Sequence, residues 1–440
     1  MNPSTRRILE EAYSYYETAW IIAYTILRYP VMAPITFLVF LARVIAEVGL
    51  WILNSNTNVS GVALKDVSTF GYQINLRLQQ ACFWPWQYAE WRNSPQKLSP
   101  LCQAQYIGFY NTVWLIVNDI ILGLTLGGFL MTNSNILALQ FLSLCDYFTQ
   151  DGITVVIDWL MGWPPPAGLK LNSELNGFLG QLFLWILQIW KESMVPLRAS
   201  LPYVIYTIGF AGHFGATISL SLLSDLVAAF TMHLYLFYVV AAKIYSWQVD
   251  AILSLLTIFR GKKMNVLRNR VDNAEFDLDQ LLVGTILFTL LVFLFPTVAV
   301  YYLLFTLTRV GVVLIQGVFE VMLAFLNHFP LFAIMLRIKE PSRLPAGVKF
   351  TLLKPTKSAH GTVYLKMDNV PIGISTIFYQ YIYIVDRLVT YYLTSAMTKS
   401  FFSGRAIPRV PRLQYPTLPE RDFERFPNLK EVWDYFLTCF

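Results

Sequence analysis

The sequence predicts an all-α polytopic membrane protein of about six to eight membrane segments, with a small β-hairpin in a cytoplasmic C-terminal tail. Of its 440 residues, 56% are hydrophobic and 14% charged, whereas a soluble domain carries about 25% charged residues. Apolar windows of the ~20 residues needed to cross a bilayer lie at 31–53, 106–131, 201–223, 226–247, 281–307 and 310–336, and a marginal one lies at 175–190. These windows predict a multi-span membrane domain over residues 31–336.

Residues 1–30 are predicted to form an amphipathic, aromatic-rich entry segment that ends or kinks at Pro30. Residues 54–105 are predicted to be a polar cytoplasmic loop with tryptophans in an interfacial belt. The acceptor triplet that begins at Asn58 would instead require a lumenal loop. We favour an unused triplet, because such triplets arise often by chance. Residues 136–160 are predicted to be an interfacial helix pair on the opposite side.

The windows 281–307 and 310–336 are predicted to form a hairpin that turns near Arg309 and returns the tail to the cytoplasmic side. The tail, residues 337–440, contains 15 Lys and Arg against 8 Asp and Glu. An excess of basic residues is typical of the cytoplasmic face, although an ordinary solvated tail would have the same composition. Short β-rich runs at Val348–Leu353 and Thr362–Met367 predict a small hairpin.

No catalytic, metal or cofactor site is predicted. The four cysteines are scattered, with no histidine at ligand spacing. The Asp277-Leu-Asp279 triplet resembles a motif that binds a divalent metal against a diphosphate, but the chain has no room for the nucleotide-binding domain that such an enzyme needs. We interpret Asp277 and Asp279 as carboxylates at the N-terminus of the next membrane helix.

Asp225 and His233 are the intramembrane polar candidates. Ionisable side chains within a bilayer are costly and often functional. Asp225 is predicted to lie at the break between two spans, as a helix start on the lumenal side. We favour helix-to-helix hydrogen bonds for both residues over a proton relay, and we interpret Asp119 in the same way. Arg43 and Glu47 are predicted to form an ion pair one helical turn apart, in which the opposite charges partly offset each other's desolvation.

Within the cytoplasmic loop 248–280, residues 259–280 contain five basic residues followed by four acidic ones. Within it, Met264, Leu267 and Val271 recur at helical spacing, so residues 260–272 are predicted to form a short basic amphipathic helix on the membrane surface. The alternative is a topology signal without a partner. The candidate partner- or lipid-binding residues are Arg260, Lys262, Lys263, Asn265, Arg268 and Arg270, with Asp277 and Asp279 in support.

Six segments carry a family resemblance: Asp158–Asn172, Ser219–Leu226, His233–Tyr238, Arg260–Asp272, Asp277–Thr289 and Arg343–Phe350. Together they closely resemble the Q subunit family (PIG-Q type) of the glycosylphosphatidylinositol N-acetylglucosaminyltransferase complex. The resemblance covers about residues 145–355. The block Arg-Gly-Lys-Lys-Met-Asn-Val-Leu-Arg-Asn-Arg-Val-Asp is its most specific part.

The resemblance implies a non-catalytic scaffold or stabilising subunit of an endoplasmic reticulum membrane complex. That complex transfers N-acetylglucosamine from UDP-GlcNAc to phosphatidylinositol, the first step of GPI-anchor biosynthesis. The implied partners are the catalytic glycosyltransferase subunit, other small membrane subunits, and phosphatidylinositol or anionic lipid headgroups, with no nucleic acid. Two other hypotheses stay open: a membrane-embedded lipid-glycan enzyme using Asp225, His233 and Asp277, and a subunit that presents or transports the lipid.

Overall fold

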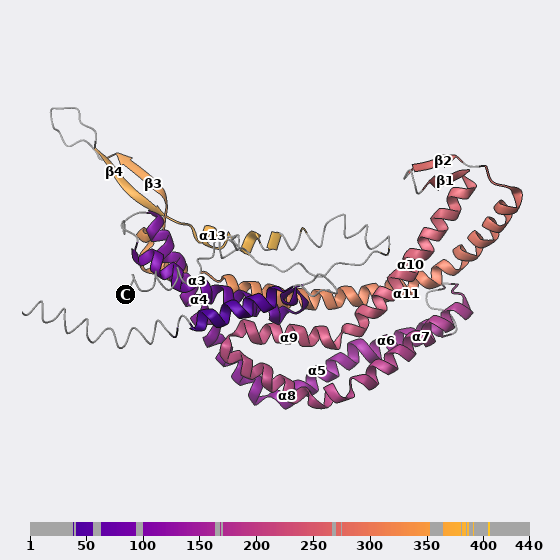
Figure 1. Cartoon of the computed structure of the whole chain (residues 1–440), viewed down its shortest axis with the longest axis horizontal. Coiled ribbons are helices and arrows are strands. Elements are labelled where there is room, and N and C mark those ends of the chain that lie inside the picture. Colours follow the sequence, from indigo (N-terminus) through magenta and orange to yellow (C-terminus); the bar gives the residue numbers. More distant parts are fainter. Residues whose placement is uncertain are drawn as a thin grey trace, which may run out of the picture. The chain divides into compact units, whose positions relative to one another are not determined.

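A computed structural model shows a largely helical protein with two small β-hairpins (Figure 1). It describes residues 38, 41–55, 63–93, 100–162, 168, 170–265, 270–273, 275–352, 364–379, 381–383, 385–386, 390 and 404. The chain divides into two compact units, which are Met1–Trp114 with Pro416–Phe440, and Leu115–Tyr415. The predicted entry segment 1–30, the triplet at Asn58 and the last 36 residues lie outside the described part.

The first unit contains a helix over residues 41–54, then α2 (Leu64–Val67), α3 (Thr69–Asn93) and the beginning of α4 (Pro100–Thr132). The prediction of a loop over 54–105 is therefore wrong. Some polar residues of this segment pack inside the unit: Asn54 Nδ2 donates to Asn75 Oδ1 at 3.3 Å, and Asn75 is buried. The predicted ion pair between Arg43 and Glu47 is present at 2.9 Å.

The second unit is a layered arrangement of long helices (Figure 1). After α4 come α5 (Ser134–Cys145), the π-helix η1 (Asp146–Asp151), α6 (Gly152–Met161), α7 (Ser173–Ser193), α8 (Val195–Ala211), the 3-10 helix η3 (Gly212–Phe214), α9 (Ala216–Phe230), α10 (Met232–Phe259) and α11 (Leu278–His328). The helices α5 and α6 agree with the predicted helix pair over 136–160. One hydrophobic core joins α6, α7, α10 and α11, and a second joins α4, α5, α8 and α9.

Three helices in the described part are long and apolar enough to cross a membrane: Tyr106–Thr132, Met232–Phe259 and Leu278–His328. The first agrees with the window 106–131, and the second lies later than the predicted 226–247. The window 201–223 is divided at Gly215, whose φ of 139° is accessible to glycine but strained for other residues. Of the predicted six to eight membrane segments, three candidate helices are present in the described part of the chain.

The predicted hairpin at Arg309 is also wrong, because α11 runs through this position without a break over 51 residues. The Arg309 guanidinium is buried and lies 4.9 Å from the centre of the Tyr235 ring. A cation over an aromatic face is stabilised without water, so the charge does not require an exposed turn. The helix instead changes direction along its length (Figure 1), as expected from Pro296 in its interior.

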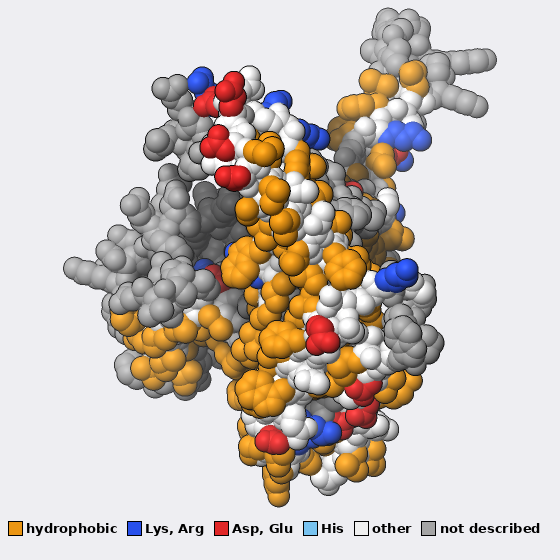
Figure 2. All heavy atoms as spheres, turned by 90° about the vertical axis from the view of Figure 1, so that its right-hand side faces the viewer, with side chains coloured by type: hydrophobic (Ala, Val, Ile, Leu, Met, Phe, Trp, Pro, Cys, Tyr) orange, Lys and Arg blue, Asp and Glu red, His pale blue; other side chains and the backbone are white. Residues whose placement is uncertain are grey.

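After α11 come α12 (Leu331–Lys339), the 3-10 helix η4 (Pro341–Arg343), β3 (Pro345–Leu352), β4 (Leu365–Pro371) and α13 (Ile374–Ile377). The strands β3 and β4 pair antiparallel, with Lys349 opposite Asp368. The predicted tail hairpin is therefore confirmed. On the face shown in Figure 2, hydrophobic side chains form a broad band, and most of the charged side chains lie toward its two ends.

Candidate functional site

A basic hairpin connects α10 to α11. The helix α10 ends at Phe259, and Gly261 follows with φ of 59°, the left-handed conformation that commonly ends helices. The strands β1 (Lys262–Asn265) and β2 (Arg270–Asn273) then pair antiparallel. The prediction of an amphipathic helix over 260–272 is therefore wrong, because Gly261 ends the helix and the two strands pair their backbones instead.

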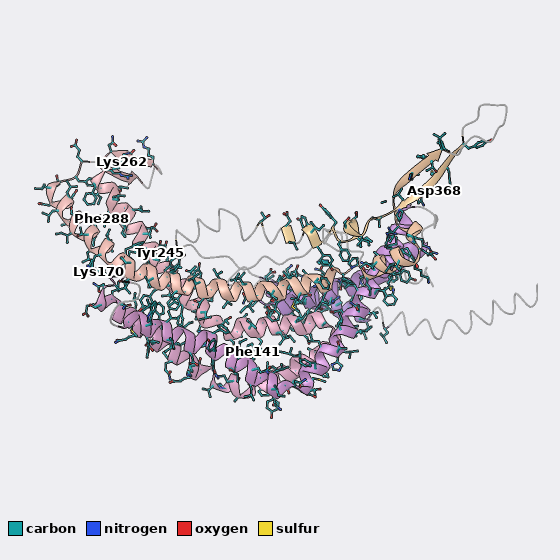
Figure 3. All side chains as sticks on the ribbon, turned by 180° about the vertical axis from the view of Figure 1, so that it is seen from behind. Phe141, Lys170, Tyr245, Lys262, Phe288 and Asp368 are labelled. Atoms are coloured by element: carbon teal, nitrogen blue, oxygen red, sulfur yellow. The ribbon has the colours of Figure 1, made fainter. Side chains whose placement is uncertain are left out.

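The described candidate residues of this segment lie at the tip of the α10–α11 pair, where Figure 3 labels Lys262. Arg260 and Lys262 are exposed. Arg270 is also exposed and pairs with Asp272 on the same strand at 2.7 Å. Lys263 and Asn265 lie on β1, with Lys263 opposite Asp272, and Arg268 lies outside the described residues. The hairpin thus presents at least three exposed cations at the end of a two-helix arm.

Two carboxylates follow the basic hairpin. Asp277 occupies the N-cap position of α11 and Asp279 lies in its first turn. Both are exposed, and the positive end of the helix dipole stabilises carboxylates at these positions. Their interpretation as helix N-terminal residues is confirmed in position, although the Asp277 side chain makes no capping hydrogen bond.

The arm below the hairpin is held together by aromatic contacts between α10 and α11. The Phe259 and Phe288 rings lie 5.4 Å apart edge to face, and the Tyr245 and Tyr302 rings stack at 4.3 Å. Figure 3 labels Phe288 and Tyr245 along this seam. The basic hairpin is therefore carried on a packed helix pair.

A buried carboxylate joins α4 to the break between α8 and α9. Asp119 is 2% exposed, and its two oxygens accept hydrogen bonds from the Thr217 backbone N–H at 2.9 Å and the Thr217 hydroxyl at 2.8 Å. Thr217 lies in the first turn of α9, where backbone N–H groups have no partner within the helix. The predicted helix-to-helix role of Asp119 is thus confirmed, while sequence reasoning missed its partner Thr217.

Glycines bring the same helices into backbone contact. A Cβ at Gly127 of α4 would lie 2.3 Å from the Gly209 carbonyl oxygen of α8, and one at Gly123 would lie 2.2 Å from that of Gly212. Side-chain-free contacts of this kind are typical of helix pairs in membranes. The four-residue spacing of Gly123 and Gly127 is the sequence signal that could have revealed this contact.

Of the two intramembrane candidates, Asp225 lies inside a helix and His233 lies just after a helix break. Asp225 is half-buried in the interior of α9, so its prediction as a helix start is wrong, because the break comes later, at Thr231. His233 is 1% exposed in the first turn of α10, with its ring 5.2 Å from that of Trp190 and 5.9 Å from that of Phe237. His233 is thus a core residue with aromatic neighbours.

The residues of the enzyme hypothesis do not meet. His233 lies in the first turn of α10. Asp277 and Asp279 come after the basic hairpin, which follows the last residue of α10. A helix of 28 residues is about 40 Å long at 1.5 Å per residue. A reacting group within hydrogen-bond distance of His233 is therefore far out of reach of Asp277.

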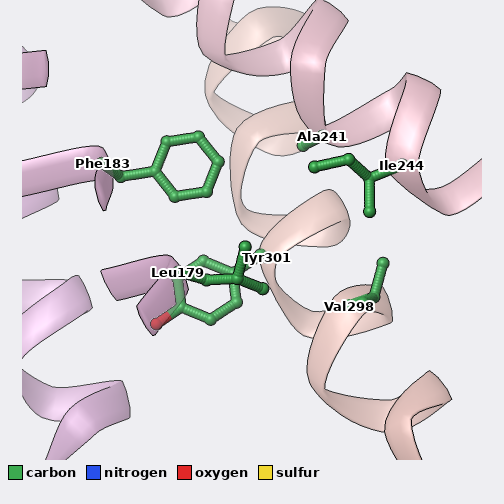
Figure 4. A pocket seen from close by; sticks show the side chains of 6 residues that line it. All are labelled: Leu179, Phe183, Ala241, Ile244, Val298 and Tyr301. Carbon is green, nitrogen blue, oxygen red and sulfur yellow. The ribbon is translucent and has the colours of Figure 1, made fainter. Parts of the chain in front are cut away.

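A small apolar crevice lies between α7, α10 and α11 (Figure 4). Its free volume is about 10 Å³, far below the roughly 300–1,000 Å³ of typical small-molecule pockets. The polar group in its lining is the Tyr301 hydroxyl, which donates to Asn176 Oδ1 at 2.9 Å. The lining is formed by Leu179, Phe183, Ala241, Ile244, Val298 and Tyr301. This crevice is too small for a nucleotide sugar.

Among the described residues, no group of three or more His, Cys, Asp or Glu side chains could hold a metal ion. Several described polar contacts join one helix to another, among them Asp119 with Thr217 and Tyr301 with Asn176. Fold and contacts together define a mostly helical protein whose described part has three helices able to cross a membrane, with a basic hairpin at the end of two of them.

Residues 71–346 match the family model described as N-acetylglucosaminyl transferase component (Gpi1). The chain belongs to this family, which confirms the resemblance to the Q subunits. It is 37% identical over 396 residues to the N-acetylglucosaminyl-phosphatidylinositol biosynthetic protein gpi1 of Schizosaccharomyces pombe, a match that covers 88% of this chain and 60% of the relative.

Two further relatives are named as subunits. The phosphatidylinositol N-acetylglucosaminyltransferase subunit GPI1 of Saccharomyces cerevisiae is 35% identical over 86% of this chain and 65% of its own length. The subunit Q of the Homo sapiens transferase is 40% identical over 58% of this chain and 33% of its own length. The chain thus spans less than two thirds of each relative. No solved structure matches it.

Proposed function

We propose that this chain is a non-catalytic scaffold subunit of the endoplasmic reticulum complex that transfers N-acetylglucosamine from UDP-GlcNAc to phosphatidylinositol, the first step of GPI-anchor biosynthesis. The observation that carries this proposal is the family match over residues 71–346, together with relatives named as subunits of that transferase. The partners would be the catalytic glycosyltransferase subunit and small membrane subunits.

The internal geometry supports a scaffold better than a catalyst. His233 is packed among aromatic rings at the beginning of α10, and Asp277 follows the hairpin beyond the other end of this helix, which is about 40 Å long. Two pairs of buried polar side chains form hydrogen bonds that join helices: Asp119 with Thr217, and Tyr301 with Asn176. Side chains whose hydrogen bonds are made within the protein stabilise its structure rather than react with a substrate.

The proposed organisation follows the sequence: an entry segment at 1–30, a membrane domain at 31–336 with the basic loop 248–280, and a basic tail at 337–440. We place the basic hairpin and the tail on the cytoplasmic side, where lysine and arginine are enriched. There the exposed Arg260, Lys262 and Arg270 would contact anionic headgroups or an acidic surface of a partner.

The first experiment purifies the tagged full chain from microsomes in mild detergent, identifies the proteins that accompany it, and measures transfer of labelled N-acetylglucosamine to phosphatidylinositol. We expect transfer only when a glycosyltransferase with a soluble domain co-purifies. Transfer by the chain expressed and purified alone would overturn the proposal. The variant Asp225→Asn is expected to leave transfer by the assembled complex unchanged, since Asp225 would have no chemical role.

The second experiment tests the basic hairpin. The variant Lys262→Gln/Arg270→Gln removes two exposed cations without introducing repulsion of Asp272. We expect weaker recovery of the complex or lower transfer per assembled complex. The matched control, Lys349→Gln/Lys366→Gln, removes two exposed cations from the β3–β4 hairpin. Equal effects of the two variants, or no effect of the first, would show that the basic hairpin is not part of the binding surface.

A further inference from the structure

Two charged side chains on α10 differ from the other charges in the candidate membrane helices. The described charges in these helices are Asp119, Lys243, Asp250, Asp279, Arg309 and Glu320. Asp119 and Arg309 are buried, Glu320 is half-buried, and Asp279 lies in the first turn of its helix. Lys243 and Asp250 are exposed in the interior of α10.

These two residues belong to a polar stripe along α10, formed by Lys243, Trp247, Asp250 and Ser254. All four are exposed, and their spacing of four, three and four places them on one face of the helix. The Lys243 ammonium lies 5.3 Å from the centre of the Trp247 ring. In the described part of the chain, neither charge takes part in an ion pair.

The contacts that the described residues make with α10 lie on other sides of the helix than the stripe. Buried Gln248, on a different side of α10, donates from Nε2 to the Leu291 carbonyl oxygen of α11 at 2.9 Å. Gly404 occupies a third side, where its added Cβ would lie 2.8 Å from the Tyr245 ring and 3.0 Å from the Ala242 carbonyl oxygen. At about 100° per residue, neither contact covers the stripe.

The basic hairpin indicates how deep the stripe lies. Arg260 and Lys262 directly follow α10 and suit a headgroup layer. Asp250 precedes Arg260 by ten residues, which is about 15 Å along a helix and half of a hydrocarbon core of about 30 Å. Lysine can extend its long side chain to an interface, but aspartate is too short to do so. An exposed carboxylate at this depth is therefore costly unless it has a partner.

We propose that the polar stripe of α10 is a docking face for a transmembrane helix of another subunit. The charges of Asp250 and Lys243 predict the side chains of that helix. It would carry a basic or amide side chain opposite Asp250 and, two helical turns away, a hydrogen-bond acceptor opposite Lys243. Such a pairing removes the cost of both charges. This inference rests on the proposed function, in which the chain holds other membrane subunits.

The test places a photo-crosslinking amino acid at Ser254 of the full chain in microsomes, with Val283 as a matched control. Val283 is 63% exposed on the apolar surface of α11. We expect Ser254 to crosslink to a membrane subunit that co-purifies with transferase activity, and Val283 to give much less of this product. In parallel, Asp250→Leu is expected to lower recovery of that subunit about 3- to 20-fold, the change in binding that corresponds to the loss of one hydrogen bond between membrane helices.

A charge exchange then tests the pairing itself. If the crosslinked helix carries a basic residue, its replacement by aspartate should restore recovery when combined with Asp250→Lys. A crosslink to this chain's own tail, or to lipid alone while the complex still co-purifies, would overturn the docking face and leave the proposed function intact. Failure of the unmodified chain to co-purify with any transferase subunit would instead overturn the proposed function.

Discussion

Asp119 shows how one buried carboxylate can organise a helix break. It accepts two hydrogen bonds from Thr217 at the start of α9, and a Cβ on the neighbouring Gly215 would lie 2.2 Å from its Oδ2. The carboxylate therefore needs both a donor pair and a glycine beside it. Sequence alone indicated that Asp119 bonds to another helix, but the donor is 98 residues away and no local pattern identifies it.

We expect Asp119→Ala to lower the free energy of unfolding by about 3 kcal/mol, because two buried donors of Thr217 lose their acceptor. The measurement is denaturant unfolding of the purified full chain in detergent, followed by tryptophan fluorescence. Thr125→Ala on the same helix is the control, since its exposed hydroxyl bonds only within α4. Equal losses for the two variants would show that Asp119 has no special structural role.

Cys145, at the end of α5, is expected to react slowly with thiol reagents. Burial, together with the neighbouring Asp146, raises the pKa of Cys145 from 9.0 to about 11. Because the thiolate is the reactive form, its fraction at pH 8 should be about 100-fold lower than that of an ordinary thiol. Site-resolved mass spectrometry with N-ethylmaleimide measures this rate, which should keep rising with pH up to pH 10. A rate that levels off near pH 9 would contradict the raised pKa.

At the scale of elements, the contact between α4 and α8 depends on glycine. We expect Gly127→Ala to destabilise the protein by about 1–3 kcal/mol, because the added methyl group would force the Gly209 backbone away. The adjacent Gly128→Ala is a matched control, since a Cβ there has no atom within 4 Å. Thermal unfolding of both variants in detergent measures the difference. A control as unstable as Gly127→Ala would indicate an effect on α4 itself.

The hairpin between α10 and α11 illustrates the limit of periodicity. Met264, Leu267 and Val271 recur at helical spacing, yet the segment pairs as β1 and β2. A window of about twelve residues contains too few apolar positions to separate the two structures, and the conformation of Gly261 decides between them. The β3–β4 hairpin was predictable, because its two runs are β-rich and separated by turn residues.

At the scale of the whole molecule, α11 is too long for a single perpendicular crossing. Its 51 residues extend about 76 Å, against a hydrocarbon core of about 30 Å. The helix therefore tilts strongly, bends or leaves the membrane. Windows of hydropathy counted two crossings here, because they measure apolar length and not the path of the backbone.

We expect the tip of the α10–α11 pair to lie on the cytoplasmic side. A cysteine introduced as Lys262→Cys should react with a membrane-impermeant maleimide in sealed microsomes without detergent. The exposed position and the cluster of basic residues both support this orientation. Labelling only after the membrane is permeabilised would place the tip in the lumen and contradict the cytoplasmic assignment of the basic loop.

The sequence by itself determined the class of protein, the family and the location of the basic segment. These properties depend on composition, on long apolar runs and on a motif block, all of which are local in the chain. Only the tertiary structure showed that α11 is continuous, that the window 201–223 is divided, and that Lys243 and Asp250 are exposed while Asp119 and Arg309 are buried. Burial and helix breaks depend on partners distant in sequence, such as Thr217 for Asp119, and these partners meet only when the helices pack.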